Sequence, residues 1–445
     1  MALLAAAMLV PAAPAAAQAP SAPDPRIERL LGQISEQRIV ATLEKLGSFG
    51  TRNTLSSAAS PAHGIGAARQ WILDEMKRSS PRLQVEFDIH RVAKGGRITR
   101  DLDLYNVVAI LPGRSPRRVY LTAHYDTFAR PERPDTEAAG RRSSAASAGA
   151  GQAASPAPAD HPAPGVNDDG SGTALVMELA RVFAGSGIEF DATLAFVAVA
   201  GEEQGLLGAR LHAEQAKQQG IAIDAVLNND MVGNTEAPGG ISDSRRVRVF
   251  SEAPEDSPSR QLARFVKAVG AGYVPSQQVT LVARHDRFGR GGDHTAFNQQ
   301  GFAAVRLTEA VENYERQHTA ADTLEGVNIP YLMRNVRLNA AVAASLALAP
   351  PAPVVTDERG QPTHGRRPSG YDAHLRWAPS PGAVGYVVYW REAWTPDWQH
   401  AVRVGDVCEH LIRNVSIDDH VFGVSAVGPN GEESVTAAYV NPPRR

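Results

Sequence analysis

Histidine and acidic residues recur in short motifs between residues 124 and 318, and several of these motifs directly follow apolar runs typical of β-strands. In VYLTAHYDT, His124 and Asp126 leave such a run on the same side, because the side chains of a strand alternate with a period of two. A metal-bound imidazole usually donates its other N–H to a carboxylate, and the H-x-D spacing provides one nearby. The pair suits a metal ligand and its support, although ordinary surface pairs share this spacing.

Two further motifs place adjacent carboxylates at the ends of apolar elements. Asp168 and Asp169 in NDDGSG precede a helix-like stretch, a place where aspartate is also common as an ordinary helix cap. Glu202 and Glu203 in GEEQGLLGA directly follow an apolar strand. Two adjacent carboxylates repel each other, so a bound cation would explain why they lie together at the end of a buried strand. The alternative is a pair of acidic residues in a solvent-exposed loop.

The last two candidates are Asp230, which ends the apolar run in AVLNNDMVGN, and His318, in the loop after AAVRLTEA. Each is common in isolation, but their joint occurrence at strand ends is improbable by chance, since ligands of open α/β sheets gather at the carboxyl ends of strands. Two histidines and three carboxylates suit two zinc ions that share one bridging carboxylate. A remaining glutamate is then free to act on a water between the metals.

These motifs need a sheet to bring them together, and the sequence from about residue 27 to 349 predicts one. β-rich runs alternate there with amphipathic stretches, which is typical of an α/β sheet with helices on its faces. The apolar runs show little alternation, so we expect strands buried on both faces. Strands are predicted at residues 104–111, 119–124, 193–200, 225–229, 247–251, 279–283 and 304–307. Helices are predicted at residues 64–78, 171–184, 206–219 and 259–269.

Composition narrows the possible partners and sources of stability. The chain has 445 residues, with 45 Lys and Arg against 48 Asp and Glu, so it has no basic excess for binding nucleic acid. Its 43% hydrophobic and 21% charged residues are usual for a globular protein. The single cysteine, Cys408, cannot form an intramolecular disulfide, so the fold must depend on a packed core or on metals.

The first 20 residues, MALLAAAMLVPAAPAAAQAP, predict a secretory signal peptide. They are apolar, and they end in small residues with an A-x-A pattern around residues 15–17. The run is too short and too interrupted by proline to span a membrane, which takes about 20 apolar residues. We therefore expect an exported protein, periplasmic or secreted, with no membrane span. An Ala/Pro tail is the alternative, because the usual Lys or Arg near the start is missing.

Residues 129–164 differ from their surroundings, because they contain no Ile, Leu, Val, Met, Phe, Tyr or Trp. Such a segment cannot bury enough apolar surface to offset the entropy lost on ordering. The composition predicts a low-complexity, disordered insertion inside a main domain of residues 26–349. An interdomain linker is the alternative, but the motifs on its two sides argue against it.

The amino-acid composition changes after residue 350. Residues 350–370 are typical of a linker, and residues 371–442 contain short β-rich runs separated by turns. About 70 residues of this kind fit a small all-β sandwich. The segments LRW, PGAVGYVVYW and FGVSAVGPNGEES resemble a fibronectin type III module, although His420 and Val421 stand where such modules usually carry tyrosine. The module has no ligand-like cluster, so we expect it to be accessory and to serve stability or the binding of a protein or surface partner.

The motifs HYD, NDDGSG, GEEQGLLGA, NNDMVG, GGDHTAF and QHTAADTLE occur in this order over roughly residues 35–348. The ordered set resembles the di-zinc exopeptidases typified by bacterial leucyl aminopeptidases, whose relatives include glutamate carboxypeptidase II, glutaminyl cyclases and the transferrin receptor. The resemblance implies a three-layer α/β/α sandwich with a mostly parallel central sheet. It also implies two Zn²⁺ ions and a peptide substrate.

The resemblance assigns a role to each candidate residue. It implies five metal ligands, of which the second bridges both ions: His124, Asp168, Glu203, Asp230 and His318. It also implies that Glu202 is the general base and that Asp126 orients the site. Asp293 in GGDHTAF is expected to contact the ligands rather than the metals.

This sequence departs from the family at the residue before the last histidine. Leucyl aminopeptidases often carry a tyrosine there, which steadies the tetrahedral intermediate, and Gln317 takes that position here. Tyr314 or Arg316 is expected to serve instead. The chain also has no room for the protease-associated insert that some relatives carry between early strands.

The predicted function is that of a zinc exopeptidase, an aminopeptidase in which Glu202 transfers a proton from water to the leaving amine. A carboxypeptidase or a one-zinc glutaminyl cyclase on the same scaffold is an alternative that zinc stoichiometry and a substrate panel must decide. A non-catalytic receptor-type relative is another. Such a protein would be expected to lose ligands or the base, and this sequence retains them all.

Overall fold

The computed structural model describes residues 23–130, 158–366 and 370–440. The chain divides into two compact units, one built on Ala22–Pro351 with Glu432–Val435, the other on Ala352–Gly431 and the residues after 435. The predicted signal peptide and most of the predicted insertion at 129–164 lie outside the described residues. No helix in the described ranges is long and apolar enough to cross a membrane.

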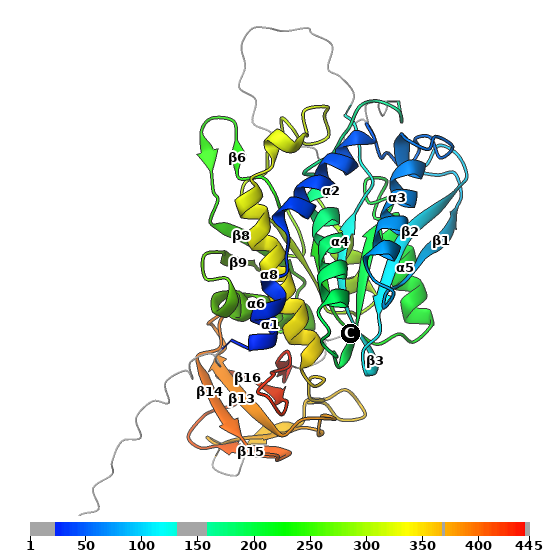
Figure 1. The fold of residues 1–445 in the computed structure, drawn as a ribbon. Coiled ribbons are helices and arrows are strands. Elements are labelled where there is room, and N and C mark those ends of the chain that lie inside the picture. Colours follow the sequence, from blue (N-terminus) through cyan, green and yellow to red (C-terminus); the bar gives the residue numbers. More distant parts are fainter. Residues whose placement is uncertain (1–22, 131–157, 367–369, 441–445) are drawn as a thin grey trace, which may run out of the picture. The chain divides into compact units, whose positions relative to one another are not determined.

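The larger unit is built on an eight-stranded sheet with the strand order β1-β2-β4-β3-β5-β10-β8-β9 (Figure 1). The strands are β1 (Gln84–Val92), β2 (Leu102–Leu111), β3 (Ser115–His124), β4 (Ala192–Val199), β5 (Ile223–Asn229), β8 (Arg246–Ser251), β9 (Gln278–Val282) and β10 (Ala304–Glu309). The four central strands β4, β3, β5 and β10 are parallel. Antiparallel pairing occurs toward the edges, where β1 pairs with β2, β2 with β4 and β8 with β10.

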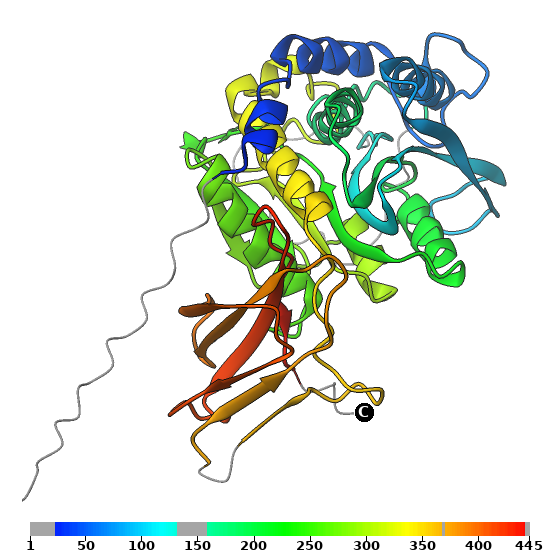
Figure 2. The same ribbon diagram turned by 60° about the horizontal axis from the view of Figure 1, so that its bottom comes forward.

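Helices cover both faces of this sheet (Figures 1 and 2). They are α1 (Pro25–Leu31), α2 (Glu36–Ser48), α3 (Gly64–Ser79), α4 (Gly170–Gly185), α5 (Leu207–Gln218), α6 (Pro258–Tyr273), α7 (Asp293–Gln299), α8 (Ile329–Leu348) and the 3₁₀ turn η1 (Leu324–Gly326). The larger apolar core joins the sheet to α4, α8 and their neighbours, whereas a second core joins its other face to α5 and α7. The predicted three-layer α/β/α architecture is confirmed.

The central strands show why the apolar runs lack alternation. Every residue of β4 and β10 is buried, because helices cover both faces of the sheet. Successive side chains of these strands nevertheless point to opposite faces of the sheet. In β3, Val119 and Leu121 pack into the larger core, while Tyr120 between them packs into the second core. Side chains near the end of β3 are therefore fixed in direction by packing on both faces.

Seven of the eight strands of this sheet were predicted from the sequence, and β1 was not. Four helices, α1, α2, α7 and α8, were also not predicted. β1 is a half-buried edge strand without an apolar run, and the alternation of polar and apolar residues in QVEFDIH, which marks it as a strand, was overlooked. α8 is buried along almost its whole length, which hides the polar face by which a helix is usually identified. A small hairpin of β6 (Glu236–Ala237) and β7 (Ile241–Ser242) was also not predicted.

The C-terminal unit consists of two antiparallel sheets, as predicted. One contains β11 (His364–Arg366), β12 (Ala373–Arg376) and β15 (Glu409–Ile412), and the other contains β14 (His400–Val404), β13 (Gly385–Glu392), β16 (His420–Val427) and β17 (Ala437–Ala438). Leu375 and Trp377 share one apolar core with Val388 and Phe422, so the sheets face each other as a sandwich. β11 lies within the segment predicted as a linker. The likeness to fibronectin type III stays a prediction.

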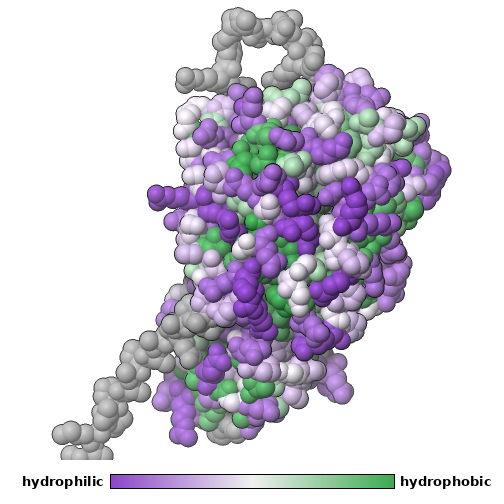
Figure 3. All heavy atoms as spheres, in the orientation of Figure 1, coloured by the Kyte–Doolittle hydropathy of each residue, from purple (hydrophilic) through white to green (hydrophobic). Residues whose placement is uncertain are grey.

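The surface carries no large apolar area on the face drawn in Figure 3, where hydrophilic residues predominate and apolar ones form small patches. Large exposed hydrophobic side chains occur singly at positions such as Ile89 and Phe288. Isolated exposure of this kind is normal for a globular protein and needs no partner to explain it.

Candidate metal centre

The candidate ligands meet at the carboxyl ends of neighbouring strands. His124 is the last residue of β3, the Glu202–Glu203 pair follows β4, and Asp230 follows β5. Asp168 precedes α4, and His318 lies in the loop between β10 and η1. Because β4, β3, β5 and β10 are adjacent and parallel, these separate motifs converge on one edge of the sheet.

Asp168 lies between the two histidines. Its Oδ1 is 3.2 Å from Nε2 of His124, and its Oδ2 is 3.1 Å from Nε2 of His318. His124 also faces Oδ1 of Asp230 at 3.8 Å, and His318 faces Oε1 of Glu203 at 2.9 Å. The two oxygens of Asp168 thus face two different sets of ligand atoms, which is the arrangement a bridging carboxylate needs.

Three groups of potential ligand atoms result, each with its atoms within 4.8 Å of one another. One of them, His124 with Glu202 and Glu203, contains the expected general base, and the other two share Asp168. We call these two the Asp230 position (His124, Asp168, Asp230) and the Glu203 position (Asp168, Glu203, His318). Each offers one imidazole nitrogen and carboxylate oxygens, a donor set that suits zinc. The residues present therefore fit a pair of zinc ions.

Electrostatics give a second argument for a cation. Burial would lower the pKa of His318, but the carboxylates of Glu203 and Asp168 outweigh burial and raise it to about 10. Burial and the charges of Glu203 and Asp230 raise the pKa of Glu202 well above its usual value. The carboxylates of this buried cluster outnumber the positive charges beside them, so a bound cation would relieve their repulsion.

Asp126 holds the site in a way that the sequence did not specify. Its carboxylate accepts hydrogen bonds from the backbone N–H groups of Glu202 and Glu203, at 3.2 and 3.3 Å, and from the Thr54 hydroxyl at 3.2 Å. Its backbone carbonyl lies 3.1 Å from Nδ1 of His124, whereas its carboxylate Oδ1 lies 3.7 Å from that atom. Asp126 thus orients the histidine mainly through its carbonyl and the glutamate pair through its side chain.

Two supporting aspartates were not recognised from the sequence as parts of the site. Asp169 is the N-cap of α4, and its carboxylate also accepts the backbone N–H groups of His124 and Met231. Asp322 accepts the N–H groups of residues 167 and 168 at 2.9 and 3.0 Å, which fixes the backbone of Asp168. The helix-cap reading was right for Asp169, and the motif QHTAADTLE already contained Asp322.

The loop that carries His318 is fixed by specific contacts. His318 has a φ of 61°, a left-handed conformation that is uncommon for a residue other than glycine. The ring of Phe128 packs edge-on against its imidazole, with centroids 5.3 Å apart. Gln317 donates from Nε2 to Oδ2 of Asp168 at 2.7 Å. Gln317 therefore reaches the cluster itself, whereas Tyr314 is half exposed.

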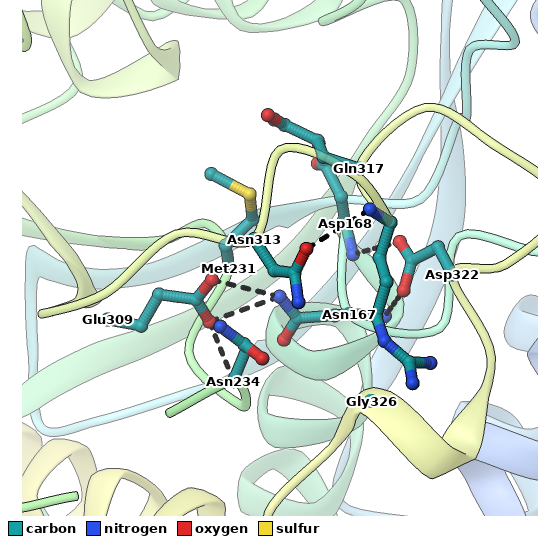
Figure 4. A pocket seen from close by; sticks show the side chains of 10 residues that line it. Asn167, Asp168, Met231, Asn234, Glu309, Asn313, Gln317, Asp322 and Gly326 are labelled. Atoms are coloured by element: carbon teal, nitrogen blue, oxygen red, sulfur yellow. Dashed lines mark hydrogen bonds between the residues drawn. The ribbon is translucent and has the colours of Figure 1, made fainter. Parts of the chain in front are cut away.

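A small recess adjoins Asp168 (Figure 4). It is lined by Asn167, Asp168, Met231, Asn234, Glu309, Asn313, Arg316, Gln317, Asp322 and Gly326. The carboxyl group of Glu309 accepts hydrogen bonds from the Asn167 amide and from the backbone N–H of Asn234. Burial raises the pKa of Glu309 well above its usual value. Most of the residues that line the recess have polar side chains, and the recess lies beside the central carboxylate of the cluster.

Two buried residues lie close to these ligands. Asp293 begins α7, and burial together with the charges of Asp126 and Asp230 raises its pKa to about 7. Neither of its carboxylate oxygens has a hydrogen-bond partner in the described ranges. Arg306, inside β10, lies 2.9 Å from Asp230 and was not singled out from the sequence. A charged residue in a buried strand was the signal that could have revealed it.

Comparison with known proteins identifies the family. The pattern of peptidase family M28 matches residues 106–343. A probable zinc metalloprotease of Pyricularia oryzae is 35% identical over 93% of this chain and 84% of its own length, and one of Leptosphaeria maculans is 35% identical over 93% and 96%. This chain belongs to peptidase family M28. The predicted resemblance is confirmed, and at this level the chain is a zinc metalloprotease.

Solved structures of low sequence identity share the fold. The LapA aminopeptidase of Legionella pneumophila is 21% identical, with a TM-score of 0.53 over 72% of this chain and 74% of that one. A glutaminyl cyclase of Macrostomum lignano is 15% identical, with a TM-score of 0.53 over 74% and 95%. Both share the fold found here, and because one is an aminopeptidase and the other a glutaminyl cyclase, the fold alone does not specify the activity.

Proposed function

We propose that this M28 metallopeptidase is a two-zinc aminopeptidase that removes residues from the N-termini of peptides. The observation that carries the proposal is the convergence of two groups of zinc-type donors on the shared carboxylate of Asp168. His124 and Asp230 would complete one group, and Glu203 and His318 the other. Zinc bound there would act as a Lewis acid that polarises the scissile carbonyl and lowers the pKa of the attacking water.

Glu202 is the proposed general base. It accepts a proton from water and returns it to the leaving amine, which needs an ionised carboxylate at the start. Without a cation, burial and its acidic neighbours raise the pKa of Glu202. Cations at the cluster would lower that pKa and leave the carboxylate ready to accept a proton. Asp126 keeps Glu202 in place by accepting its backbone N–H at 3.2 Å.

The recess beside the cluster does not itself choose the end of the substrate that is recognised. Burial raises the pKa values of Glu309 and Asp322, the latter to about 7, and Asp168 is a proposed zinc ligand, so the lining has no fixed excess of negative charge over Arg316. The choice of an aminopeptidase rests on the likeness to the LapA aminopeptidase and on a second zinc, which would be available to hold a free α-amine.

A substrate panel with metal analysis tests this function. Aminoacyl amides and peptides with a free N-terminus should be hydrolysed, and N-acetylated copies of the same peptides should not. Cleavage of the blocked peptides from the C-terminus would identify a carboxypeptidase. Ring closure of N-terminal glutamine by protein that retains one zinc would identify a glutaminyl cyclase.

We also propose that the protein is exported, on the strength of the apolar first 20 residues. Expression of the full chain with a C-terminal tag should give a mature form in the periplasm or medium whose N-terminus lies near residue 20. Recovery of the unprocessed chain from the cytoplasm would contradict export without touching the proposed chemistry.

A further inference from the structure

Arg306 lies inside β10, between β5 and β8, and its side chain is fully buried. Its Nη2 is 2.9 Å from Oδ1 of Asp230. The same oxygen of Asp230 faces Nε2 of His124, at 3.8 Å. The guanidinium therefore contacts the carboxylate oxygen that faces the Asp230 position.

A second carboxylate fixes Arg306 in this place. Its Nη1 donates to Oδ2 of Asp286 and to the carbonyl oxygen of Gly291, both at 3.2 Å. Burial would raise the pKa of Asp286, but the guanidinium groups of Arg306 and Arg287 hold it well below its ordinary value. Arg287 in turn pairs with Glu312 at 2.7 Å. Arg306 is thus a permanent cation held between two ionised carboxylates.

The contact with Asp230 acts through charge more than through a directed hydrogen bond. Nε and Nη2 of Arg306 are buried and have no aligned acceptor within the described part of the chain. Like charges repel strongly where water is excluded, because the effective dielectric constant is low. A zinc ion at the Asp230 position would share the carboxylate of Asp230 with the guanidinium of Arg306.

The Glu203 position has no comparable neighbour. Within the described residues, the carboxylate of Glu203 has an ion-pair contact of 4.0 Å or less only with His318. The guanidinium of Arg97 approaches Glu203 as well, but it donates to the backbone carbonyl oxygen at 2.8 Å. The two halves of the centre thus have similar ligands and different surrounding charge.

We propose that Arg306 makes the two metal positions unequal, so that the Glu203 position binds zinc tightly and the Asp230 position binds it weakly and exchanges it. The inference rests on the proposed two-zinc centre. Arg306 is a positioning residue in this scheme, because it contacts a ligand and not the substrate. It also supplies the charge that keeps Asp230 and Asp286 compatible with burial when the weaker position is empty.

Zinc titration of the full-length metal-free protein tests the inference. In metal-buffered equilibrium dialysis, the wild type should bind two zinc ions in two separated steps. Arg306→Met, which has a side chain of similar length without charge, should tighten the weaker step about tenfold or more and leave the tighter step nearly unchanged. Arg306→Lys retains the charge and should keep the two steps apart.

Asp286→Asn provides an opposite change in case Arg306→Met does not fold without zinc. This variant removes the carboxylate that shares Arg306, so more of the guanidinium's charge acts on Asp230. The weaker step should then become weaker still by several-fold, with the tighter step unchanged. Arg264→Met is the matched control, since Arg264 is a buried arginine of α6 that pairs with Glu255 and Asp256 and does not contact the ligands.

Thermal unfolding gives a readout that does not depend on activity. Metal-free Arg306→Met should unfold at a lower temperature than the metal-free wild type, because two buried carboxylates lose their counter-charge, and zinc should raise its unfolding temperature by more. Two equal zinc affinities in the wild type, or a weaker step that Arg306→Met leaves unchanged or weakens, would overturn the inference. Protein that binds no zinc at all would instead contradict the proposed function.

Discussion

In the described residues of the larger unit, two clusters bring a pair of histidines together with carboxylate, and one of them has the character of a metal centre. The other, which we call the Asp88 cluster, joins β1, β2 and α5. In it one oxygen of Asp88 lies 2.9 Å from Nε2 of His90, 2.8 Å from Nδ1 of His212 and 3.0 Å from the amide nitrogen of Asn106. The residue types match those of the metal centre, so the types alone do not distinguish the two.

The balance of charge and donors does distinguish them. Burial would raise the pKa of Asp88, but His212 and His90 outweigh burial and hold that pKa well below its ordinary value. One carboxylate there is satisfied by three nitrogen groups. In the metal centre Asp168 also has three nitrogen partners. Burial would raise the pKa of Asp168, but His124 and His318 hold it well below its ordinary value. Glu202 differs, because burial and its acidic neighbours raise its pKa well above the usual value. The metal centre is thus marked by an additional buried carboxylate, that of Glu202, whose charge its neighbours do not compensate.

The comparison predicts the largest effect for removal of zinc. Chelation should abolish peptidase activity and lower the unfolding temperature by several degrees, because an ion present at 100 times its Kd stabilises the fold by about 2.7 kcal/mol. Asp88→Asn should show the same zinc-dependent shift as the wild type. Differential scanning calorimetry with and without zinc measures the shift in unfolding temperature. If that shift disappears in Asp88→Asn, the Asp88 cluster and not the proposed centre would bind the zinc.

The next prediction separates the neighbours Glu202 and Glu203. Glu202→Ala removes the base and leaves the five proposed ligands, so zinc should stay bound while kcat falls by about 10² to 10⁴-fold. Glu203→Ala removes a ligand and should lose zinc together with activity. Zinc content measured beside kcat decides the matter. Loss of zinc in Glu202→Ala, with zinc retained in Glu203→Ala, would show that the two roles are reversed.

Asp126 should have an intermediate effect, because it supports the glutamate pair without being a proposed ligand. Asp126→Ala leaves the backbone N–H groups of Glu202 and Glu203 without their acceptor. We expect zinc affinity or kcat/KM to fall by about 10 to 100-fold, as for other residues that orient ligands. Thr54→Val, which removes only the hydroxyl donor to Asp126, is the control and should change either quantity far less.

The motifs made most of the metal centre predictable because its chemistry is local in sequence. His124, Glu203 and Asp230 each stand at the end of a strand whose apolar character is plain, so the parallel sheet alone brings them together. The supports are different in kind. Asp126 acts on the backbone of residues 202 and 203, a contact between residues 76 and 77 positions apart that no local pattern encodes.

Arg306 shows a second reason why the sequence was insufficient. The run AAVRLTEA contains a single arginine, and the sequence does not show what this charged residue contacts. The pairing of β10 with β5 places it beside Asp230. Among the elements, β1 and α8 were not predicted, for different reasons. The sequence QVEFDIH of β1 does alternate between polar and apolar residues, and this signal was overlooked because β1 contains no apolar run. α8 is buried on nearly all sides and lacks the polar face that identifies a helix.

The smallest expected effect belongs to the Asp88 cluster and concerns stability alone. Asp88→Asn should leave zinc content and kcat unchanged and lower the free energy of unfolding by about 1 to 3 kcal/mol, the usual value for hydrogen bonds to a charged group. Because the folded-state pKa of Asp88 is depressed, its contribution is fully present above the unfolded pKa of about 4. It is lost as the pH falls through the lower folded value.

The difference in unfolding free energy between the wild type and Asp88→Asn should therefore be largest above pH 4 and shrink in more acidic solution. Urea denaturation across this range measures it. A difference that grows with acidity would mean that the ionised form of Asp88 does not stabilise the fold, and the contrast between the two clusters would fail.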